Sequence, residues 1–108
     1  MTYKIIYSPE ALDDLRAIYM YIAFEKLAPE NAESQTSRIR KAINGLDIFP
    51  EGHTLLGWEP WASMGVRFLP VDNYTVYYLV DTAQKAVEIV RIFYSGRDVE
   101  RILQTGIE

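Results

Sequence analysis

The sequence predicts an α+β domain in which a mainly antiparallel sheet carries a helical hairpin on one face. Large side chains alternate with smaller ones near the start, and two stretches with apolar residues at helical spacing follow. Three segments rich in β-branched and aromatic residues come after them. The expected order is therefore β-α-α-β-β-β with a short C-terminal helical tail. At 108 residues, of which 49% are hydrophobic, residues 1–108 are expected to form a single domain.

The first strand and helix are predicted from residues 3–26. Tyr3 to Tyr7 has the length and side chains of a strand. Ser8 is suited to the N-cap of a helix, and Pro9 to its first turn. This helix is expected to reach about Lys26. Its predicted core stripe consists of Leu12, Leu15, Tyr19, Ile22 and Ala23.

Pro29 begins a second helix, which Phe49 and Pro50 end. A short connection joins the two helices, so we expect an antiparallel hairpin with its apolar faces covered by the sheet. Residues 51–65 show no period and are predicted to be a loop with room for an extra turn, anchored by Trp58 and Trp61. The core stripe predicted for the second helix consists of Ala32, Ile39, Ile43 and Leu46.

The remaining strands are predicted at 66–71, 74–80 and 86–94, and together they form an antiparallel meander. Asp72 and Asn73 supply the turn between the first two. Pro70 lacks a backbone donor and therefore favours a sheet edge or a bulge. Asp98 is suited to cap a short helix over 99–104.

Composition excludes several classes of site. The chain contains no cysteine and a single histidine, His53. We therefore expect neither a disulfide nor a metal site built from these residues, and we expect no cofactor. The net charge of −4 argues against a surface coated in basic residues for nucleic acid. No apolar run approaches the length of a membrane span. We therefore expect a soluble, cytoplasmic protein without a membrane partner.

An arginine lies in the middle of the last strand and needs a partner. Burying a guanidinium alone costs several kcal/mol. Arg91 therefore pairs with a carboxylate such as Asp14 or Asp98, reaches an edge, or faces a cleft that is kept wet for a ligand. Adjacent helix residues cannot face one another as a catalytic dyad, so Asp13 and Asp14 are expected on the solvated face.

Five segments, taken in order, resemble the RelE/ParE superfamily of bacterial toxins from type II toxin-antitoxin modules. The resemblance covers nearly the whole chain. The segments are Tyr-Lys-Ile-Ile-Tyr-Ser-Pro-Glu-Ala with Asp14-Leu15, then Phe49-Pro50, Gly65-Val66-Arg67, residues 71–81, and Val90-Arg91-Ile92-Phe93-Tyr94-Ser95-Gly96-Arg97-Asp98.

The resemblance implies a growth-inhibiting toxin that a cognate antitoxin neutralises by wrapping around it. RelE-like members act as mRNA interferases that bind the ribosome and cut messages without a metal. ParE-like members inhibit DNA gyrase without cleaving RNA. A third alternative is a degenerate member that binds its antitoxin and inhibits nothing. The acidic composition and the tyrosine at position 94, where many members have histidine, favour the ParE-like alternative.

The first expectation is nonetheless the RelE-like endoribonuclease. In that interpretation Arg67 and Arg91, on neighbouring strands, bracket a phosphate, and Tyr94 transfers a proton. Arg97 adds a phosphate contact. Tyr74 and Tyr78 either stack on a base or simply pack in the sheet. Strict strand alternation places Arg91 and Tyr94 on opposite faces, so their cooperation requires a bulge or an earlier end to the strand.

Overall fold

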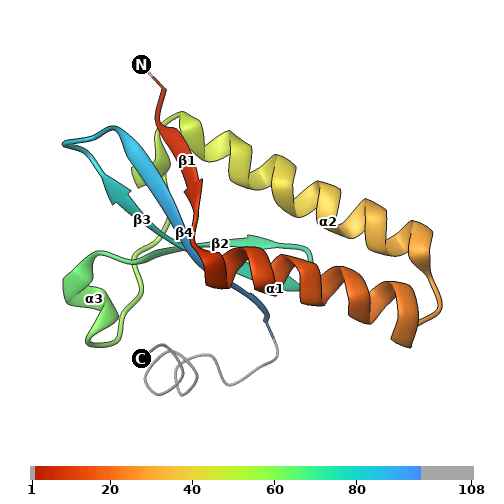
Figure 1. Cartoon of the computed structure of the whole chain (residues 1–108). Coiled ribbons are helices and arrows are strands. Elements are labelled where there is room, and N and C mark those ends of the chain that lie inside the picture. The colour runs from red at the N-terminus through yellow and green to blue at the C-terminus, as the bar shows by residue number, and fades with distance from the viewer. Residues whose placement is uncertain (1, 96–108) are drawn as a thin grey trace.

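A computed structural model describes residues 2–95 of the chain and contains a four-stranded sheet. The strand order is β1-β4-β3-β2, with β1 parallel to β4 and the other neighbours antiparallel. The predicted α+β class and the antiparallel meander are confirmed. Figure 1 shows the helices alongside this sheet. The strands are β1 (Lys4–Tyr7), β2 (Arg67–Val71), β3 (Tyr74–Asp81) and β4 (Ala86–Tyr94).

The helical hairpin consists of α1 (Pro9–Met20), extended by a π-helical segment η1 (Tyr21–Glu25), and α2 (Pro29–Asn44). Ser8 caps α1 as predicted, since its hydroxyl accepts the Ala11 N–H at 3.0 Å. The same hydroxyl donates to the Val90 carbonyl at 2.9 Å. One side chain therefore starts the first helix and fastens it to the last strand.

The main core lies between the hairpin and one face of the sheet. The stripe predicted for the second helix is confirmed, because Ala32, Ile39, Ile43 and Leu46 are all buried. On α1 the prediction was wrong for Leu12, which is 45% exposed. The buried stripe of α1 has the expected four- and three-residue spacing, but it begins at Ala11, one residue before Leu12. Its members are Ala11, Leu15 and Ile18.

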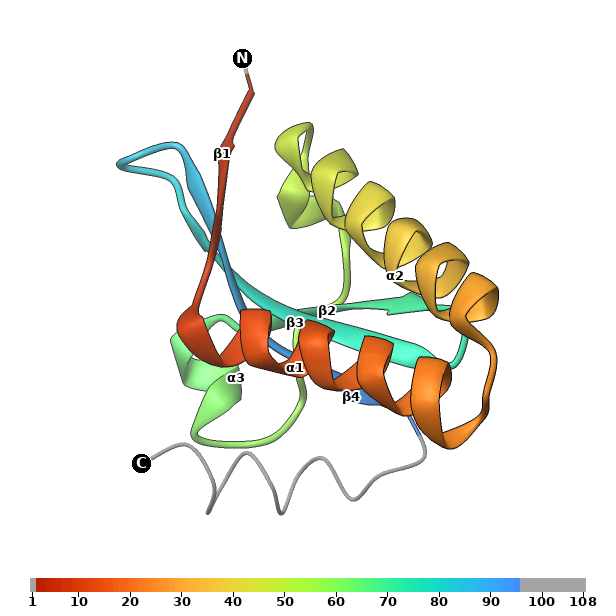
Figure 2. The ribbon, with the colours of Figure 1, turned by 45° about the vertical axis from the view of Figure 1, so that its right-hand side comes forward.

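A smaller core covers part of the opposite face of the sheet. Residues 50–64 form two short turns, η3 (Pro50–Gly52) and α3 (Trp61–Met64), where a loop with an extra turn was predicted. In Figure 2, α3 lies across the strands from α2. Trp61 is 7% exposed and anchors this segment as expected, and Trp58 packs beside it. The buried members are Leu56, Trp61, Val66, Tyr77 and Phe93.

A β-bulge in β4 decides which side chains face the hairpin. Tyr78 pairs with Ile89, but the preceding Tyr77 pairs with Arg91, so Val90 is an extra residue. Val87, Ile89 and Ile92 consequently all belong to the helix-side core, with a spacing of two and then three. Without the bulge, alternation would turn the Arg91 side chain into that core.

β2, which contains Pro70, is an edge strand as predicted. The helix expected at 99–104 and its cap Asp98 lie outside the described residues. Among residues 2–95, no helix has the length and apolar character that a membrane crossing requires.

Candidate functional site

Arg91 on β4 is bound by the carboxylate of Asp14 on α1. Its Nε and Nη2 donate hydrogen bonds of 2.8 and 3.0 Å to the two Asp14 oxygens. The two side chains are only 16% and 13% exposed. The guanidinium also lies over the Phe93 ring, 4.4 Å from its centroid. Hydrogen bonding to Asp14 raises the pKa of Arg91. Of the alternatives left open by the sequence, pairing with a helix carboxylate is confirmed.

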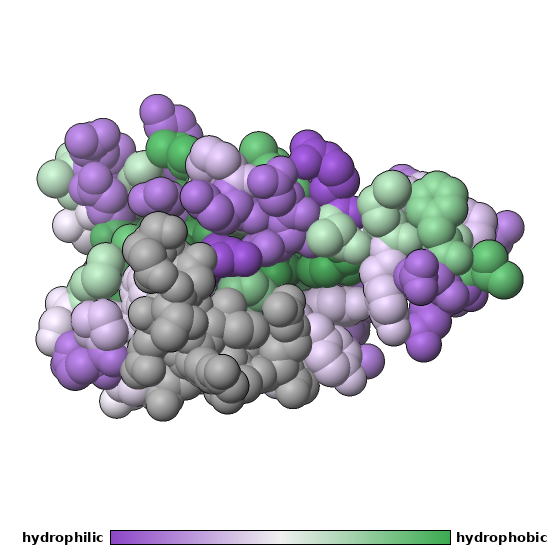
Figure 3. Space-filling model, turned by 60° about the horizontal axis from the view of Figure 1, so that its bottom comes forward, coloured by the Kyte–Doolittle hydropathy of each residue, from purple (hydrophilic) through white to green (hydrophobic). Residues whose placement is uncertain are grey.

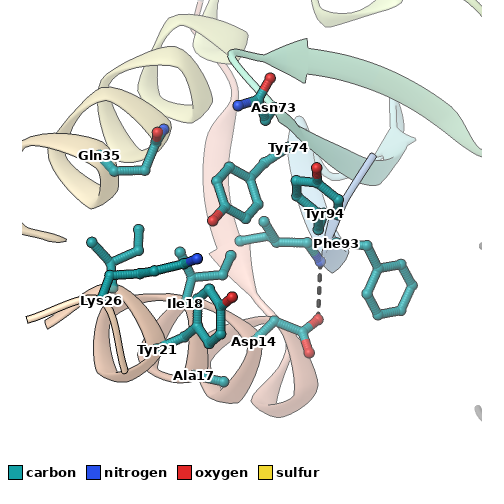
Figure 4. A pocket seen from close by; sticks show the side chains of 12 residues that line it. Asp14, Ala17, Ile18, Tyr21, Lys26, Gln35, Asn73, Tyr74, Phe93 and Tyr94 are labelled. Atoms are coloured by element: carbon teal, nitrogen blue, oxygen red, sulfur yellow. Dashed lines mark hydrogen bonds between the residues drawn. The ribbon is translucent and has the colours of Figure 1, made fainter. Parts of the chain in front are cut away.

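The Asp14 carboxylate also completes the edge of the sheet. β1 stops pairing with β4 at Tyr7 and Ile89, and no other strand among residues 2–95 pairs with the rest of that β4 edge. The Ser8 N–H continues the pairing to the Ile89 carbonyl at 3.0 Å, and the Ile92 N–H donates to Asp14 at 2.9 Å. Figure 4 draws the second bond as a dashed line. Buried backbone donors need such partners.

The solvated position predicted for the two adjacent aspartates was therefore right for only one. Asp13 pairs with Arg16 at 2.8 Å, and both side chains are more than 70% exposed. Asp14 instead points toward β4 and is largely buried. Adjacent residues on a helix are about 100° apart around its axis, which separates a solvated carboxylate from a buried one.

Arg67 does not join Arg91, so the predicted phosphate bracket was wrong. β3 lies between β2 and β4, so the two strands are not neighbours. Arg67 is paired with Tyr78 and Arg91 with Tyr77, and consecutive residues of a strand point to opposite faces. The Arg67 guanidinium donates instead to the His53 carbonyl at 2.7 Å. The structure thus holds the two arginines on opposite faces of the sheet.

Tyr78 lies in the main core rather than on an open face. Its side chain is fully buried, and its hydroxyl donates to the Pro50 carbonyl at 2.6 Å. Burial raises its pKa to about 12. Of the two readings of Tyr78, packing in the sheet is confirmed. Stacking on a base would require exposing this ring, so Tyr78 is corrected from a substrate contact to a core residue.

Tyr74 and Tyr94 are brought together at the end of the β3–β4 pair. Their rings meet edge to face with centroids 5.8 Å apart, and Tyr94 is half exposed. Burial is the main cause that raises the pKa of Tyr74. The bulge precedes both Arg91 and Tyr94, so these two residues remain on opposite faces, as strict alternation predicts. Arg97 lies outside the described residues.

A groove of about 720 Å³ opens between the end of the first helix and these tyrosines. Its floor is apolar, with Ile18, Ile22 and Ile92 contributing. In Figure 4, Tyr21 and Lys26 project from the helix toward Tyr74 on the strand side. The full lining is Asp14, Ala17, Ile18, Tyr21, Ile22, Lys26, Gln35, Asn73, Tyr74, Ile92, Phe93 and Tyr94. Tyrosines above an apolar floor are typical of protein-binding surfaces.

Several groove residues were missed by the sequence analysis. No sequence motif marks Tyr21, Lys26, Gln35 or Asn73. The available signal was Tyr21 itself, an aromatic residue that lies off the predicted core stripe and is exposed. The turn between β2 and β3 is fastened beside them. Gln35 and Arg38 of α2 both donate to Asp72, at 3.0 and 2.8 Å. This clasp fixes the groove wall that contains Asn73.

Within residues 2–95, no three His, Asp or Glu side chains gather where they could hold a metal ion. Residues 5–99 match the family model described as the ParE toxin of the type II toxin-antitoxin system, parDE. The chain belongs to the ParE toxin family. The resemblance to RelE/ParE toxins of type II toxin-antitoxin modules is thereby confirmed. A comparison with curated proteins finds no significant match.

Solved structures show that this ParE-family toxin shares its fold with both branches of the superfamily. The chromosomal ParDE system of P. aeruginosa matches with 24% identity and a TM-score of 0.69, covering 86% of this chain and 96% of that chain. The RelBE2 complex of Mycobacterium tuberculosis matches with 20% identity and a TM-score of 0.59, covering 87% and 99%. The RelE-RelB complex of Pyrococcus horikoshii OT3 matches with 17% identity and a TM-score of 0.61, covering 90% and 99%.

Proposed function

We propose that this toxin acts by binding its target and not by cutting RNA, as a ParE-like inhibitor of DNA gyrase in the cytoplasm. The observation that carries the proposal is the separation of the arginines. Metal-free RNA cleavage needs free cationic side chains near the phosphate, together with a proton-transfer group. Arg91 is neutralised by Asp14, while Arg67 lies on the other face and donates to a backbone carbonyl.

The cognate antitoxin is proposed to occupy the groove between the first helix and the end of the β3–β4 pair. The solved relatives named above include toxin-antitoxin complexes. An amphipathic segment fits the groove, because its apolar side chains can pack on Ala17 and Ile22 beside the tyrosines. Lys26, whose Nζ lies 5.6 Å from the Tyr21 ring centroid, can pair with an acidic residue of that segment.

One pair of assays separates binding from cleavage. Purified toxin is added to gyrase with plasmid DNA, and supercoiling and cleaved-DNA complexes are measured. The same preparation is added to a reconstituted translation system in which mRNA 5' ends are mapped. We expect gyrase inhibition with intact messages, reversed by the antitoxin. Cuts phased by the ribosome, with gyrase unaffected, would refute the proposal.

A second candidate function, RelE-like mRNA cleavage without a metal or cofactor, is favoured by the position of Tyr94. This residue is half exposed and lies at the groove beside Tyr74, where its hydroxyl can reach a bound molecule. In this alternative Tyr94 transfers the proton and Arg67 contacts phosphate. Tyr94→Phe keeps the ring but removes the hydroxyl, so it would abolish message cleavage. Under the gyrase proposal the same variant retains its inhibitory potency.

A further inference from the structure

The end of the helical hairpin exposes a compact group of large apolar side chains. We call Met20, Tyr21, Phe24 and Leu27 the hairpin tip. Their exposed fractions are 51%, 51%, 63% and 84%. Met20 and Phe24 are about one helical turn apart, and Leu27 follows in the turn that ends the first helix. Figure 1 shows that the hairpin extends past the strands, and Figure 3 shows apolar surface at the right-hand end.

Leu27 is unfavourable at its position for two independent reasons. Its φ is 53°, in the left-handed region that glycine and asparagine tolerate better than leucine. The residue is also 84% exposed, more than any other large apolar residue within 2–95. The turn itself is closed by backbone bonds, from Lys26 N–H to Tyr21 and from Ala28 N–H to Ile22. The leucine side chain therefore adds little to this fold, and such local strain is common at functional sites.

Charges around the hairpin tip define the partner it fits. Lys26 is folded over the Tyr21 ring. Glu25 and Glu30 are exposed, and the described residues supply neither with an ion pair. An apolar surface with an acidic rim is complementary to an apolar pocket on a protein with basic residues around its mouth. Glu25 and Glu30 outnumber Lys26 at this end of the hairpin, which disfavours nucleic acid, anionic membranes and a second copy of the tip as the partner.

We propose that the hairpin tip is the surface through which this toxin docks into an apolar, basic-rimmed pocket of its target protein. This inference rests on the proposed function, in which the toxin inhibits by binding. Because Tyr21 belongs both to the hairpin tip and to the groove, an antitoxin in the groove obstructs docking. The antitoxin then neutralises the toxin because both partners need Tyr21.

The test compares two tip variants with a matched control. Phe24→Ser and Leu27→Gly each remove an exposed apolar side chain from the hairpin tip. Ile48→Asn does the same at a 68% exposed position beyond the far end of α2. Each purified protein is titrated against gyrase supercoiling, and each is induced in cells to follow growth arrest. We expect each tip variant to lose at least about tenfold in potency, as anchor residues do. The control stays within about twofold of the wild type, since Ile48 lies outside the hairpin tip.

Each outcome has a defined meaning. Tip variants as potent as the wild type against gyrase overturn the inference and leave the proposed function intact. In another outcome the wild type arrests growth without inhibiting gyrase supercoiling, while both tip variants fail to arrest growth. That result overturns gyrase as the target and supports docking through the tip. A wild type inactive in both assays overturns both. Loss of antitoxin binding or of self-association in Leu27→Gly, with full gyrase inhibition, also overturns the inference, because the tip then serves another partner.

Discussion

Replacing Asp14 tests whether the buried ion pair holds the first helix to the last strand. The carboxylate of Asp14 accepts three hydrogen bonds, of 2.8 and 3.0 Å from Arg91 and 2.9 Å from the Ile92 N–H. Asp14→Ala removes all three and leaves a guanidinium that is only 16% exposed without its counter-charge. It also leaves the Ile92 N–H without a partner, at an edge that no other strand of the described residues covers.

The magnitude follows from the burial of the pair. Breaking a buried ion pair by removing one partner costs about 3–5 kcal/mol. The remaining exposure of Arg91 and Asp14 places the expected loss in the free energy of unfolding near the lower value, at about 3 kcal/mol. For a domain of this size, a loss of that magnitude lowers Tm by at least about 12 °C. Asp13→Ala is the matched control, because its ion pair with Arg16 has the same 2.8 Å length but is exposed. We expect it to cost less than about 1 kcal/mol.

Urea unfolding of the wild type and both variants measures these differences. A double variant, Asp14→Ala with Arg91→Met, removes both charges and keeps an apolar chain over Phe93. It should recover at least about 1 kcal/mol relative to Asp14→Ala, because no unpaired charge remains. Unfolding free energies of Asp14→Ala and Asp13→Ala that agree within about 0.5 kcal/mol would refute this role of Asp14, because burial would then add nothing to the pair.

Three further predictions concern single side chains. Hydrogen bonding from Arg38 lowers the pKa of Asp72 below its ordinary 3.8, so this carboxylate stabilises the fold above that pH and the contribution is lost as pH falls. Urea midpoints of Asp72→Asn should therefore change less on acidification than those of the wild type; an equal change would count against the clasp. Burial raises the pKa of Tyr78 from 10.0 to about 12, so its stabilising effect is complete below pH 10.0 and declines as pH rises toward about 12. Tyr78→Phe should lose about 1–3 kcal/mol at neutral pH, because the Pro50 carbonyl loses its donor, and should show a shallower alkaline decline in urea unfolding. An unchanged alkaline decline would contradict the assignment. Leu27→Gly relieves a left-handed backbone and should match or exceed the wild-type free energy of unfolding, by up to about 1 kcal/mol in thermal melts. A lower Tm would show that the Leu27 side chain supports the fold.

Local signals in the sequence predicted most of the fold. The last strand was predicted at 86–94, and β4 spans Ala86–Tyr94. Ser8 caps the first helix, and Pro70 lies in an edge strand, as their chemistry requires. These features depend on hydrogen bonds and burial within a few residues of one another. Residue type and spacing therefore suffice to predict them.

The candidate site was predicted less well because its geometry is not local. The sequence indicated both Tyr74 and Tyr94 as candidate site residues, and the two rings meet at the groove. The groove wall formed by Tyr21 and Lys26 was missed, because no pattern in the first helix indicates which strand end lies opposite. The resemblance to a toxin family supplied the class of protein, and the family match confirmed it.

The sequence by itself determined that Arg91 needs a partner, and only the tertiary structure chose Asp14, 77 residues away. It likewise determined strands that contain Arg67 and Arg91 but not the faces on which they lie. One extra residue at Val90 resets the side-chain alternation of β4 after the bulge, and β3 separates the two strands. Strand alternation is a local rule, whereas register and bulges arise from pairing between distant segments. The side chains that can act together were therefore decided by the assembled sheet.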